Sequence, residues 1–176
     1  MQNKHLYLLG YMGSGKSHLG QQLARRLQRP FLDLDAHIEV LEGQTIAAIF
    51  ERQGEAHFRA AEAAALRATA DTPPSVVALG GGTPIYHDNM VWLLSHGTTV
   101  FLDPPIAVLV QRLSGATNDR PLLAGTAKAA LREQVAAMLA ERRPIYEQAQ
   151  YHIRASEEQA AAVLAALGWD GPQGPK

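Results

Sequence analysis

Short apolar runs alternate along this chain with longer stretches in which apolar residues recur every three or four positions. The first run, 5–9, reads His-Leu-Tyr-Leu-Leu and stops at Gly10, which is typical of a short buried strand. The stretch after it carries Leu19, Leu23 and Leu27 at spacing four, the apolar stripe of a helix packed on a sheet. The same patterns predict strands at 31–35, 75–79, 98–102 and 151–154, and helices at 45–53, 55–70, 89–95, 106–113, 127–143 and 156–167.

Strands that alternate with helices predict βαβ units and therefore an α/β fold. We expect three layers, α/β/α, around a central, mostly parallel sheet of five strands, with 151–154 as an edge strand. A chain of 176 residues is large enough for one domain with its own core, which we assign to 1–168. The segment 169–176 is rich in Gly and Pro and is expected to be a frayed tail.

The first strand leads into the segment 10–17, Gly-Tyr-Met-Gly-Ser-Gly-Lys-Ser, which fits G-x-x-x-x-G-K-[ST]. Between a strand and a helix this pattern indicates a P-loop, because glycines let successive N–H groups turn toward phosphate and the helix N-terminus adds partial positive charge. Lys16 is expected to reach the β- and γ-phosphates, and Ser17 to offer its hydroxyl to Mg²⁺. A glycine-rich turn that only joins strand to helix is the alternative, which the complete pattern disfavours.

Polar residues also follow the second and third predicted strands. Asp33 and Asp35 lie two apart, so on an extended strand their side chains would point to the same face. Neighbouring carboxylates repel each other unless a cation or proton separates them, and Mg²⁺ bound with ATP could be that cation. The alternative is that Asp35 only N-caps a helix starting near Ala36. Because ligands bind beyond the carboxyl ends of parallel strands, we expect the P-loop, these aspartates and the glycine triplet 80–82 to meet at one sheet edge.

Two arginines in other segments have both a functional and a structural interpretation. Arg59 and Glu62 are helical neighbours that, as a solvated pair, would contribute only about 0.2–0.5 kcal/mol. An arginine fork is equally suited to gripping a carboxylate. Arg120 lies in the polar stretch 114–125, which is either an ordinary surface loop or a mobile lid that covers ATP. Gln159 closes a capping box, so it could serve its helix alone.

Composition narrows the class of protein further. The net charge of −1 gives no basic field that would suggest a nucleic-acid or membrane partner. The absence of cysteine excludes disulfides and thiolate chemistry, and the seven histidines show no metal-ligand spacing. We see neither a signal peptide nor an apolar stretch long enough to cross a bilayer, and we expect a cytoplasmic protein. Arg25, Arg26 and Arg29 are interpreted as a solvated helix face.

These features together resemble the shikimate kinase family of small-molecule P-loop kinases, which belongs to the nucleoside-monophosphate-kinase-like superfamily. The resemblance extends from the first strand to about Gln159. It rests on elements in the family's order: the P-loop, D-x-D at Asp33–Asp35, F-R-x-x-E at Phe58–Glu62, the glycine triplet, R-P-L-L at Arg120–Leu123 and R-x-P-x-Y at Arg142–Tyr146. The P-loop alone indicates only nucleotide binding, whereas the D-x-D, F-R-x-x-E and triplet combination is specific for this family.

The resemblance implies transfer of the ATP γ-phosphate to the 3-hydroxyl of shikimate, giving 3-phosphoshikimate and ADP in aromatic amino-acid biosynthesis. It implies Mg²⁺ as cofactor and a monomer whose partners are ATP or ADP and shikimate. Asp35 would hold the acceptor hydroxyl and assist its deprotonation, while Arg59 and Arg142 would clamp the substrate carboxylate. Gly81, with Gly82 beside it, would donate a backbone N–H to the substrate. The segment 33–62 would form the substrate-binding region and 114–125 the lid.

On the nucleotide side the resemblance implies that Ser17 ligates the metal and Asp33 acts through its water shell. Lys16 and Arg120 would stabilise the transferring phosphoryl group, Arg112 would stack on adenine, and Gln159 would contact the nucleotide. The P-loop residues implied to contact ATP are Gly13, Ser14, Gly15, Lys16, Ser17 and His18. His18 departs from the family, which usually has Thr at this position, so a hydroxyl expected near the α-phosphate is missing.

Other functions fit the chain less well. A different small-molecule kinase, such as a gluconate kinase, would have an acceptor site that lacks the F-R-x-x-E and triplet combination. This chain has that combination, so such a kinase is disfavoured. A regulatory nucleotide-binding module without activity is disfavoured, because the lysine, serine, aspartates and arginine that catalysis needs are all present. A GTPase switch is disfavoured because no N-K-x-D segment occurs.

Overall fold

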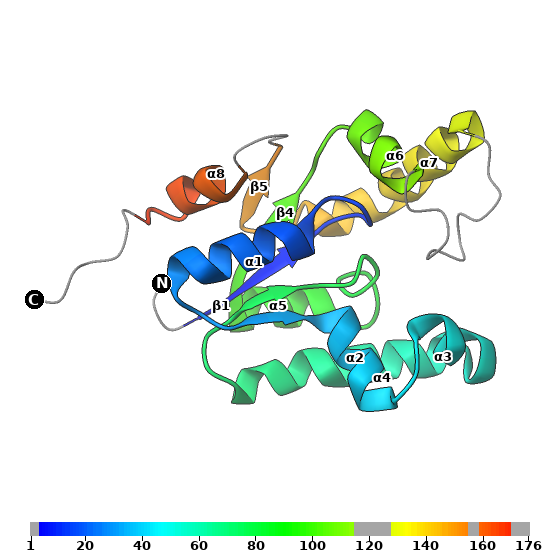
Figure 1. The fold of residues 1–176 in the computed structure, drawn as a ribbon, viewed down its shortest axis with the longest axis horizontal. Coiled ribbons are helices and arrows are strands. Elements are labelled where there is room, and N and C mark those ends of the chain that lie inside the picture. The colour runs from blue at the N-terminus through cyan, green and yellow to red at the C-terminus, as the bar shows by residue number, and fades with distance from the viewer. Residues whose placement is uncertain (1–3, 115–127, 155–158, 170–176) are drawn as a thin grey trace, which may run out of the picture.

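The computed structural model describes residues 4–114, 128–154 and 159–169 (Figure 1). Five strands form one sheet, and all of its neighbouring strands run parallel, in the order β2-β3-β1-β4-β5. The predicted α/β fold with a five-stranded sheet is therefore confirmed, with β5 at an edge. The strands are β1 (His5–Leu9), β2 (Phe31–Asp33), β3 (Val76–Ala78), β4 (Gly97–Leu102) and β5 (Tyr151–Ile153).

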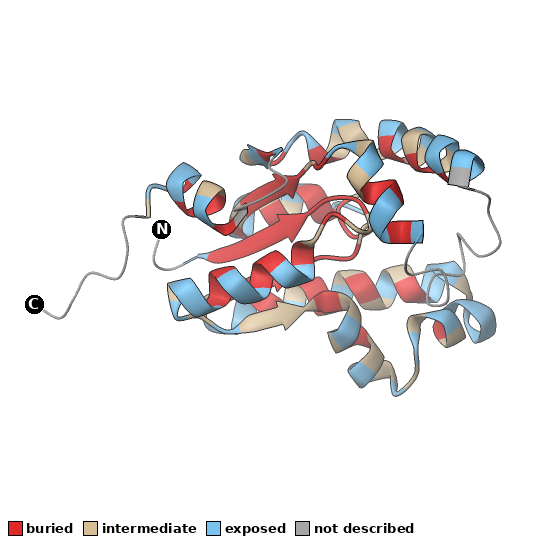
Figure 2. Ribbon diagram, turned by 45° about the horizontal axis from the view of Figure 1, so that its top comes forward, coloured by how far each residue is buried: buried red, intermediate tan, exposed pale blue. Residues whose placement is uncertain are grey.

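Helices cover both faces of this sheet, as the alternation of β1 side chains shows. Leu6 and Leu8 pack in a cluster with α1 (Lys16–Leu27) and α8 (Gln159–Ala166). Tyr7 and Leu9 pack on the opposite face, in a larger cluster with the remaining α-helices. Figure 2 shows a buried centre, formed by β1, β3 and β4, and helices whose buried residues face this centre, whereas β2 is of intermediate burial. The other helices are α2 (Leu34–Glu42), α3 (Ile46–Arg52), α4 (Gly54–Ala68), η1 (Thr69–Asp71), α5 (Asn89–His96), α6 (Ile106–Ser114) and α7 (Lys128–Tyr146).

Most observed boundaries differ from the expected ones by a residue or two, and the differences at the second strand and at the long helix affect the site. The strand predicted at 31–35 ends at Asp33, and Asp35 already lies in the first turn of α2. The reason is that Asp33 has extended backbone angles and its side chain accepts a hydrogen bond from the N–H of Ala36, so Asp33 is the N-cap. The long helix continues past Pro144 to Tyr146, which brings Tyr146 one turn beyond Arg142. Both differences place functional side chains on helices.

The carboxyl ends of the strands all lie at one edge of the sheet. In Figure 1, α2, α3 and the α6–α7 pair gather at the end toward which the strands point. Residues 115–125 of the segment predicted as a lid, and the start of the last predicted helix, fall outside the described residues. None of the helices in the described ranges is long and apolar enough to traverse a lipid bilayer.

Candidate active site

The P-loop connects β1 to α1 through two glycines with left-handed backbone angles. Gly13 has φ 81° and Gly15 has φ 96°, conformations that residues with a Cβ rarely adopt. Lys16 is 9% exposed, and its Nζ donates to the carbonyl oxygens of Gly10 at 3.0 Å and Tyr11 at 3.1 Å. The lysine head thus lies across its own loop, at the N-terminus of α1, where an anion is favoured.

Ser14 is used differently from the other P-loop residues. Its N–H donates to the carbonyl oxygen of Tyr11 at 3.1 Å, which closes the turn of the loop. Its Oγ is fully buried and has no hydrogen-bond partner among the described residues. This oxygen lies close to Gly10, because a Cβ atom added to Gly10 would be 3.1 Å from it. In this structure Ser14 therefore shapes the loop.

Asp33 and Ser17 form the pair that the metal hypothesis requires. The hydroxyl of Ser17 donates to Oδ2 of Asp33 at 2.5 Å. The sequence interpretation that Asp33 and Asp35 share one face of a strand is wrong, because the strand ends at Asp33. The alternative that Asp35 is the helix cap is wrong as well, since Asp33 takes that place with its Oδ1 at 3.4 Å from the N–H of Ala36. Two hard oxygen donors, a hydroxyl and a carboxylate, nevertheless adjoin the P-loop, which suits Mg²⁺.

Asp35 is a carboxylate in an environment that resists its ionisation. Burial raises the pKa of Asp35 to about 6; the charge of Lys16 opposes this rise, and Glu62 and Asp33 add to it. Gly80 lies directly against it, because a Cβ there would be 2.5 Å from Oδ1 of Asp35. A carboxyl group with this pKa can accept a proton near neutral pH.

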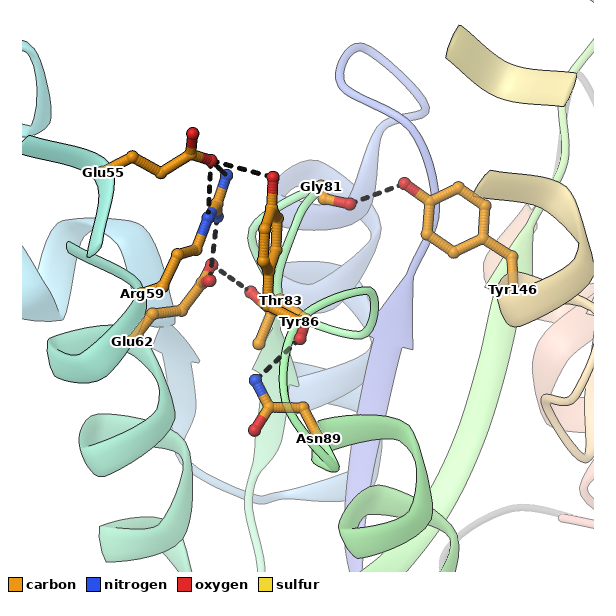
Figure 3. Close-up of polar contacts among 8 residues, drawn as sticks. All are labelled: Glu55, Arg59, Glu62, Gly81, Thr83, Tyr86, Asn89 and Tyr146. Atoms are coloured by element: carbon orange, nitrogen blue, oxygen red, sulfur yellow. Dashed lines mark hydrogen bonds and ion pairs between the residues drawn. The ribbon is translucent and has the colours of Figure 1, made fainter. Parts of the chain in front are cut away.

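Arg59 and Glu62 are not the solvated surface pair that remained possible from sequence. Glu62 is 1% exposed, and its Oε2 accepts from Nη1 of Arg59 at 2.9 Å. Its Oε1 accepts from the hydroxyl of Thr83 at 2.6 Å (Figure 3). A Cβ on Gly82 would be 2.5 Å from Nη1 of Arg59, so the guanidinium touches the glycine triplet. The arginine is thus held at the triplet by a buried acid.

Arg142 reaches the same triplet from α7. A Cβ on Gly81 would lie 3.7 Å from Nη1 of Arg142, whose Cζ also lies 5.8 Å from the ring centroid of Tyr11. The hydroxyl of Tyr146 donates to the carbonyl oxygen of Gly81 at 2.6 Å, and burial raises the pKa of Tyr146 to about 12. This contact ties the triplet to α7 on the side of Arg142.

The next residue on α7, Arg143, turns to a different partner. It forms two hydrogen bonds to Asp103, at 2.7 and 2.8 Å. The two consecutive arginines therefore separate into one that faces the triplet and one that joins α7 to the segment after β4.

A cleft of about 520 Å³ joins the P-loop, the two aspartates and Gly81 of the triplet. It is lined by Met12, Gly13, Gly15, Lys16, Ser17, His18, Asp33, Asp35, Leu79, Gly81 and Arg112. The predicted convergence of P-loop, aspartates and triplet at one sheet edge is confirmed by this lining. Phosphate-binding elements and a poised carboxylate share one hollow.

The peripheral nucleotide residues are only partly described. His18 is exposed, and its Nε2 lies 2.8 Å from Nε2 of Gln22, one turn further along α1. Arg112 donates to the carbonyl oxygen of Gly13 at 3.1 Å, which places its guanidinium at the P-loop. Arg120 and the side chain of Gln159 lie outside the described residues, so their roles stay predictions.

Three residues at the site, Glu55, Thr83 and Tyr86, were not singled out from sequence, and Tyr146 was named only as the end of the R-x-P-x-Y element, without a role of its own. Glu55 precedes Arg59 by one helical turn, a spacing that could have indicated a pair. Tyr146 stands four residues after Arg142, on the same face of a helix that was expected to end earlier. Thr83 and Tyr86 gave no local signal, because their partners lie on another element.

Comparison with known proteins agrees with this geometry. The family model for shikimate kinase matches residues 12–167. A shikimate kinase of Bacteroides fragilis is 42% identical over 146 residues, which cover 83% of this chain and 82% of that protein.

Two solved structures are also similar. One is a shikimate kinase from Bacteroides thetaiotaomicron, with a TM-score of 0.86 at 38% identity, covering 93% of this chain and 96% of that one. The other is a shikimate kinase from Acinetobacter baumannii in complex with shikimate, with a TM-score of 0.83 at 34% identity, covering 94% and 90%. Residues 12–17 of the P-loop, the two aspartates and the triplet lie within the matched residues, and this chain belongs to the shikimate kinase family.

Proposed function

We propose that this protein transfers the γ-phosphoryl group of ATP to the 3-hydroxyl of shikimate, producing 3-phosphoshikimate and ADP for aromatic amino-acid biosynthesis. The observation that carries the proposal is the cleft shared by Lys16, Ser17, Asp33, Asp35 and Gly81 of the triplet. Family membership and the shikimate complex of the Acinetobacter baumannii relative support the choice of acceptor. The enzyme is proposed to act as a cytoplasmic monomer.

On the nucleotide side, the P-loop segment 13–18 holds the phosphates of ATP. Lys16 exchanges its bonds to the loop carbonyls for bonds to the β- and γ-phosphate oxygens, whose negative charge is a better partner for an ammonium group. Ser17 would ligate Mg²⁺ and Asp33 would hold it through its water shell, which fits the adjoining hydroxyl and carboxylate oxygens. Bound there, Mg²⁺ would neutralise charge on the phosphate oxygens. Arg112 is proposed to stack on the adenine base, which its contact with the carbonyl oxygen of Gly13 in the P-loop supports, and Arg120 and Gln159 are proposed to complete the nucleotide site.

On the acceptor side, Asp35 accepts the proton of the attacking hydroxyl as the new O–P bond forms and the bond to ADP breaks in line. A pKa of about 6 leaves this carboxyl ionised at neutral pH yet basic enough to hold the proton during transfer. Arg59 and Arg142 bind the carboxylate of shikimate, one from each side of Gly81 and Gly82. Positioning and charge stabilisation then supply most of the rate enhancement.

The test is a coupled assay for ADP release with and without shikimate. We expect ADP release to depend on shikimate, and gluconate in its place to give none. In the same assay Arg59→Ala should raise the KM for shikimate at least tenfold, because a charge-assisted bond of about 1.5–3 kcal/mol is lost, and leave the KM for ATP within twofold. Shikimate-independent ADP release by a folded sample, or equal effects of the variant on both KM values, would contradict the proposal.

A further inference from the structure

The guanidinium of Arg59 is surrounded by partners that the chain itself supplies (Figure 3). Its Nη1 donates to Glu62, while its Nε and Nη2 donate to Oε1 of Glu55 at 3.2 and 3.1 Å. The Nε/Nη2 edge is one of the forks with which an arginine grips a carboxylate through two parallel hydrogen bonds. In this structure Glu55 therefore occupies an edge of Arg59 that an acidic ligand could use.

The two glutamates differ in how firmly they are held. Glu62 is buried and is also fixed by the hydroxyl of Thr83, so it is a permanent counter-ion. The side chain of Glu55 is 52% exposed, in the first turn of α4. An exposed ion pair is weak and easily exchanged, since water can solvate the released carboxylate. Glu55 is the partner that can leave.

Tyr86 contacts both members of the exchangeable pair. Its ring centroid lies 3.9 Å from Cζ of Arg59, which is within the range of a cation–π contact. Its hydroxyl donates to Oε1 of Glu55 at 2.8 Å. Tyr86 belongs to the segment between β3 and α5, whereas Arg59 and Glu55 belong to α4. A residue from a second element thus sets the plane of the arginine and the position of the glutamate.

We propose that Glu55 stands in for the substrate carboxylate in the empty site, and that Tyr86 is a positioning residue that holds Arg59 flat for the exchange. This assignment rests on the proposed function, in which Arg59 binds the carboxylate of shikimate. A ligand carboxylate takes the Nε/Nη2 edge while Glu55 turns to solvent, and Glu62 and the Tyr86 ring keep the guanidinium in place. One carboxylate replaces another at the Nε/Nη2 edge, so a neutral ring compound, which offers no anionic oxygen to this edge, has nothing to exchange for Glu55.

The variants Tyr86→Ala, Tyr86→Phe and Glu55→Gln separate the two roles. Tyr86→Ala removes the ring and should raise the KM for shikimate about five- to tenfold, the size expected for a lost cation–π contact. Tyr86→Phe keeps the ring and should stay within about twofold of wild type. Glu55→Gln should lower the KM for shikimate about threefold, because a neutral amide competes less for the arginine. The kcat and the KM for ATP should stay within about twofold in all three.

A control variant on α3 and a second substitution of Tyr86 complete the experiment. Glu51→Gln removes one negative charge from an exposed position of α3 and should leave the KM for shikimate unchanged. If Tyr86→Ala does not fold, Tyr86→Leu keeps apolar bulk without a π face and carries the same expectation.

Three results would overturn the assignment. A wild-type KM for shikimate in Tyr86→Ala would remove Tyr86 as a positioning residue. A raised KM in Glu55→Gln would make the glutamate a support of Arg59 and not a competitor. Arg59→Ala, measured in parallel, shows which proposal has failed. A normal KM for shikimate in this variant would contradict both the role of Arg59 in binding the substrate carboxylate and the assignment of Glu55 and Tyr86. A raised KM would support the role of Arg59, so the results for Glu55 and Tyr86 would then bear on their assignment alone.

Discussion

Replacing Asp35 by Asn should make the protein more stable and nearly inactive at the same time. The folded structure raises the pKa of this carboxyl from 3.8 to about 6, mainly by burial. At about 1.4 kcal/mol for each pKa unit, ionised Asp35 costs the folded state about 3 kcal/mol relative to the unfolded chain. Because the side chain is only partly buried, water screens this cost, and we expect about 1–2 kcal/mol. Asparagine has nearly the same shape and does not ionise.

The direction of the pH dependence follows from the raised pKa. Below about pH 4 the carboxyl is protonated in the folded and the unfolded protein, and Asp35 does not lower the free energy of unfolding. As pH rises toward 6, the unfolded chain releases this proton while the folded protein retains it, so wild-type stability falls relative to the variant. Above about pH 6 the difference is complete, and it corresponds to a gain of about 3–6 °C in Tm for a chain of this size.

Thermal unfolding of both proteins from pH 4 to pH 8, with turnover measured by ADP release, tests this reasoning. The Tm difference should open between pH 4 and pH 6, and kcat of the variant should fall about 10²–10⁴-fold, the usual contribution of a general base. Asp71→Asn removes an exposed carboxylate beyond the amino end of β3 and should shift neither quantity. A variant that is less stable than wild type at pH 7, or that retains normal kcat, would refute the role given to Asp35.

Three further predictions concern substitutions of Arg142, Gly80 and Asp33. Arg142→Ala should raise the KM for shikimate at least tenfold, while Arg143→Ala should lower Tm with a normal KM, because only the first faces the triplet. Gly80→Ala should lower kcat at least tenfold without affecting the KM for ATP, since its Cβ would displace the catalytic carboxylate; wild-type kcat would contradict this. Asp33→Ala should raise the Mg²⁺ concentration for half-maximal activity and cost about 1 kcal/mol of stability as a lost helix cap. Thr45→Ala, which removes the cap of α3, should cost similar stability with an unchanged Mg²⁺ requirement, so equal Mg²⁺ effects would rule out the metal role.

The fold and the phosphate-binding side of the cleft could be predicted because their sequence signals are local. Apolar runs of strand length and leucines at spacing four depend on backbone periodicity, which every segment expresses by itself. The P-loop is equally local, since its glycines and the helix that follows form one continuous stretch. Even the meeting of P-loop, aspartates and triplet followed from a general property of parallel sheets.

The predictions that were wrong concern residues whose state depends on neighbours from other elements. Asp35 belongs to a helix because Asp33 caps it, and a D-x-D pattern fits a strand and a cap equally well. Glu62 was compatible with a solvated pair because helical spacing does not reveal which face a second element will bury. Its burial comes from Thr83 and the triplet, about twenty positions further along the chain.

The sequence by itself determined the order of the elements, the phosphate-binding loop and the identity of the charged groups available for chemistry. Only the tertiary structure decided the environment of these groups. It raises the pKa of Asp35, which lies against Gly80, and it directs Arg142 to the triplet and Arg143 to Asp103. It also encloses Arg59 between Glu55 and Tyr86. The physical reason is that periodicity and turn chemistry act over a few residues. Burial and charge balance arise only when the strand order β2-β3-β1-β4-β5 brings separated segments into contact.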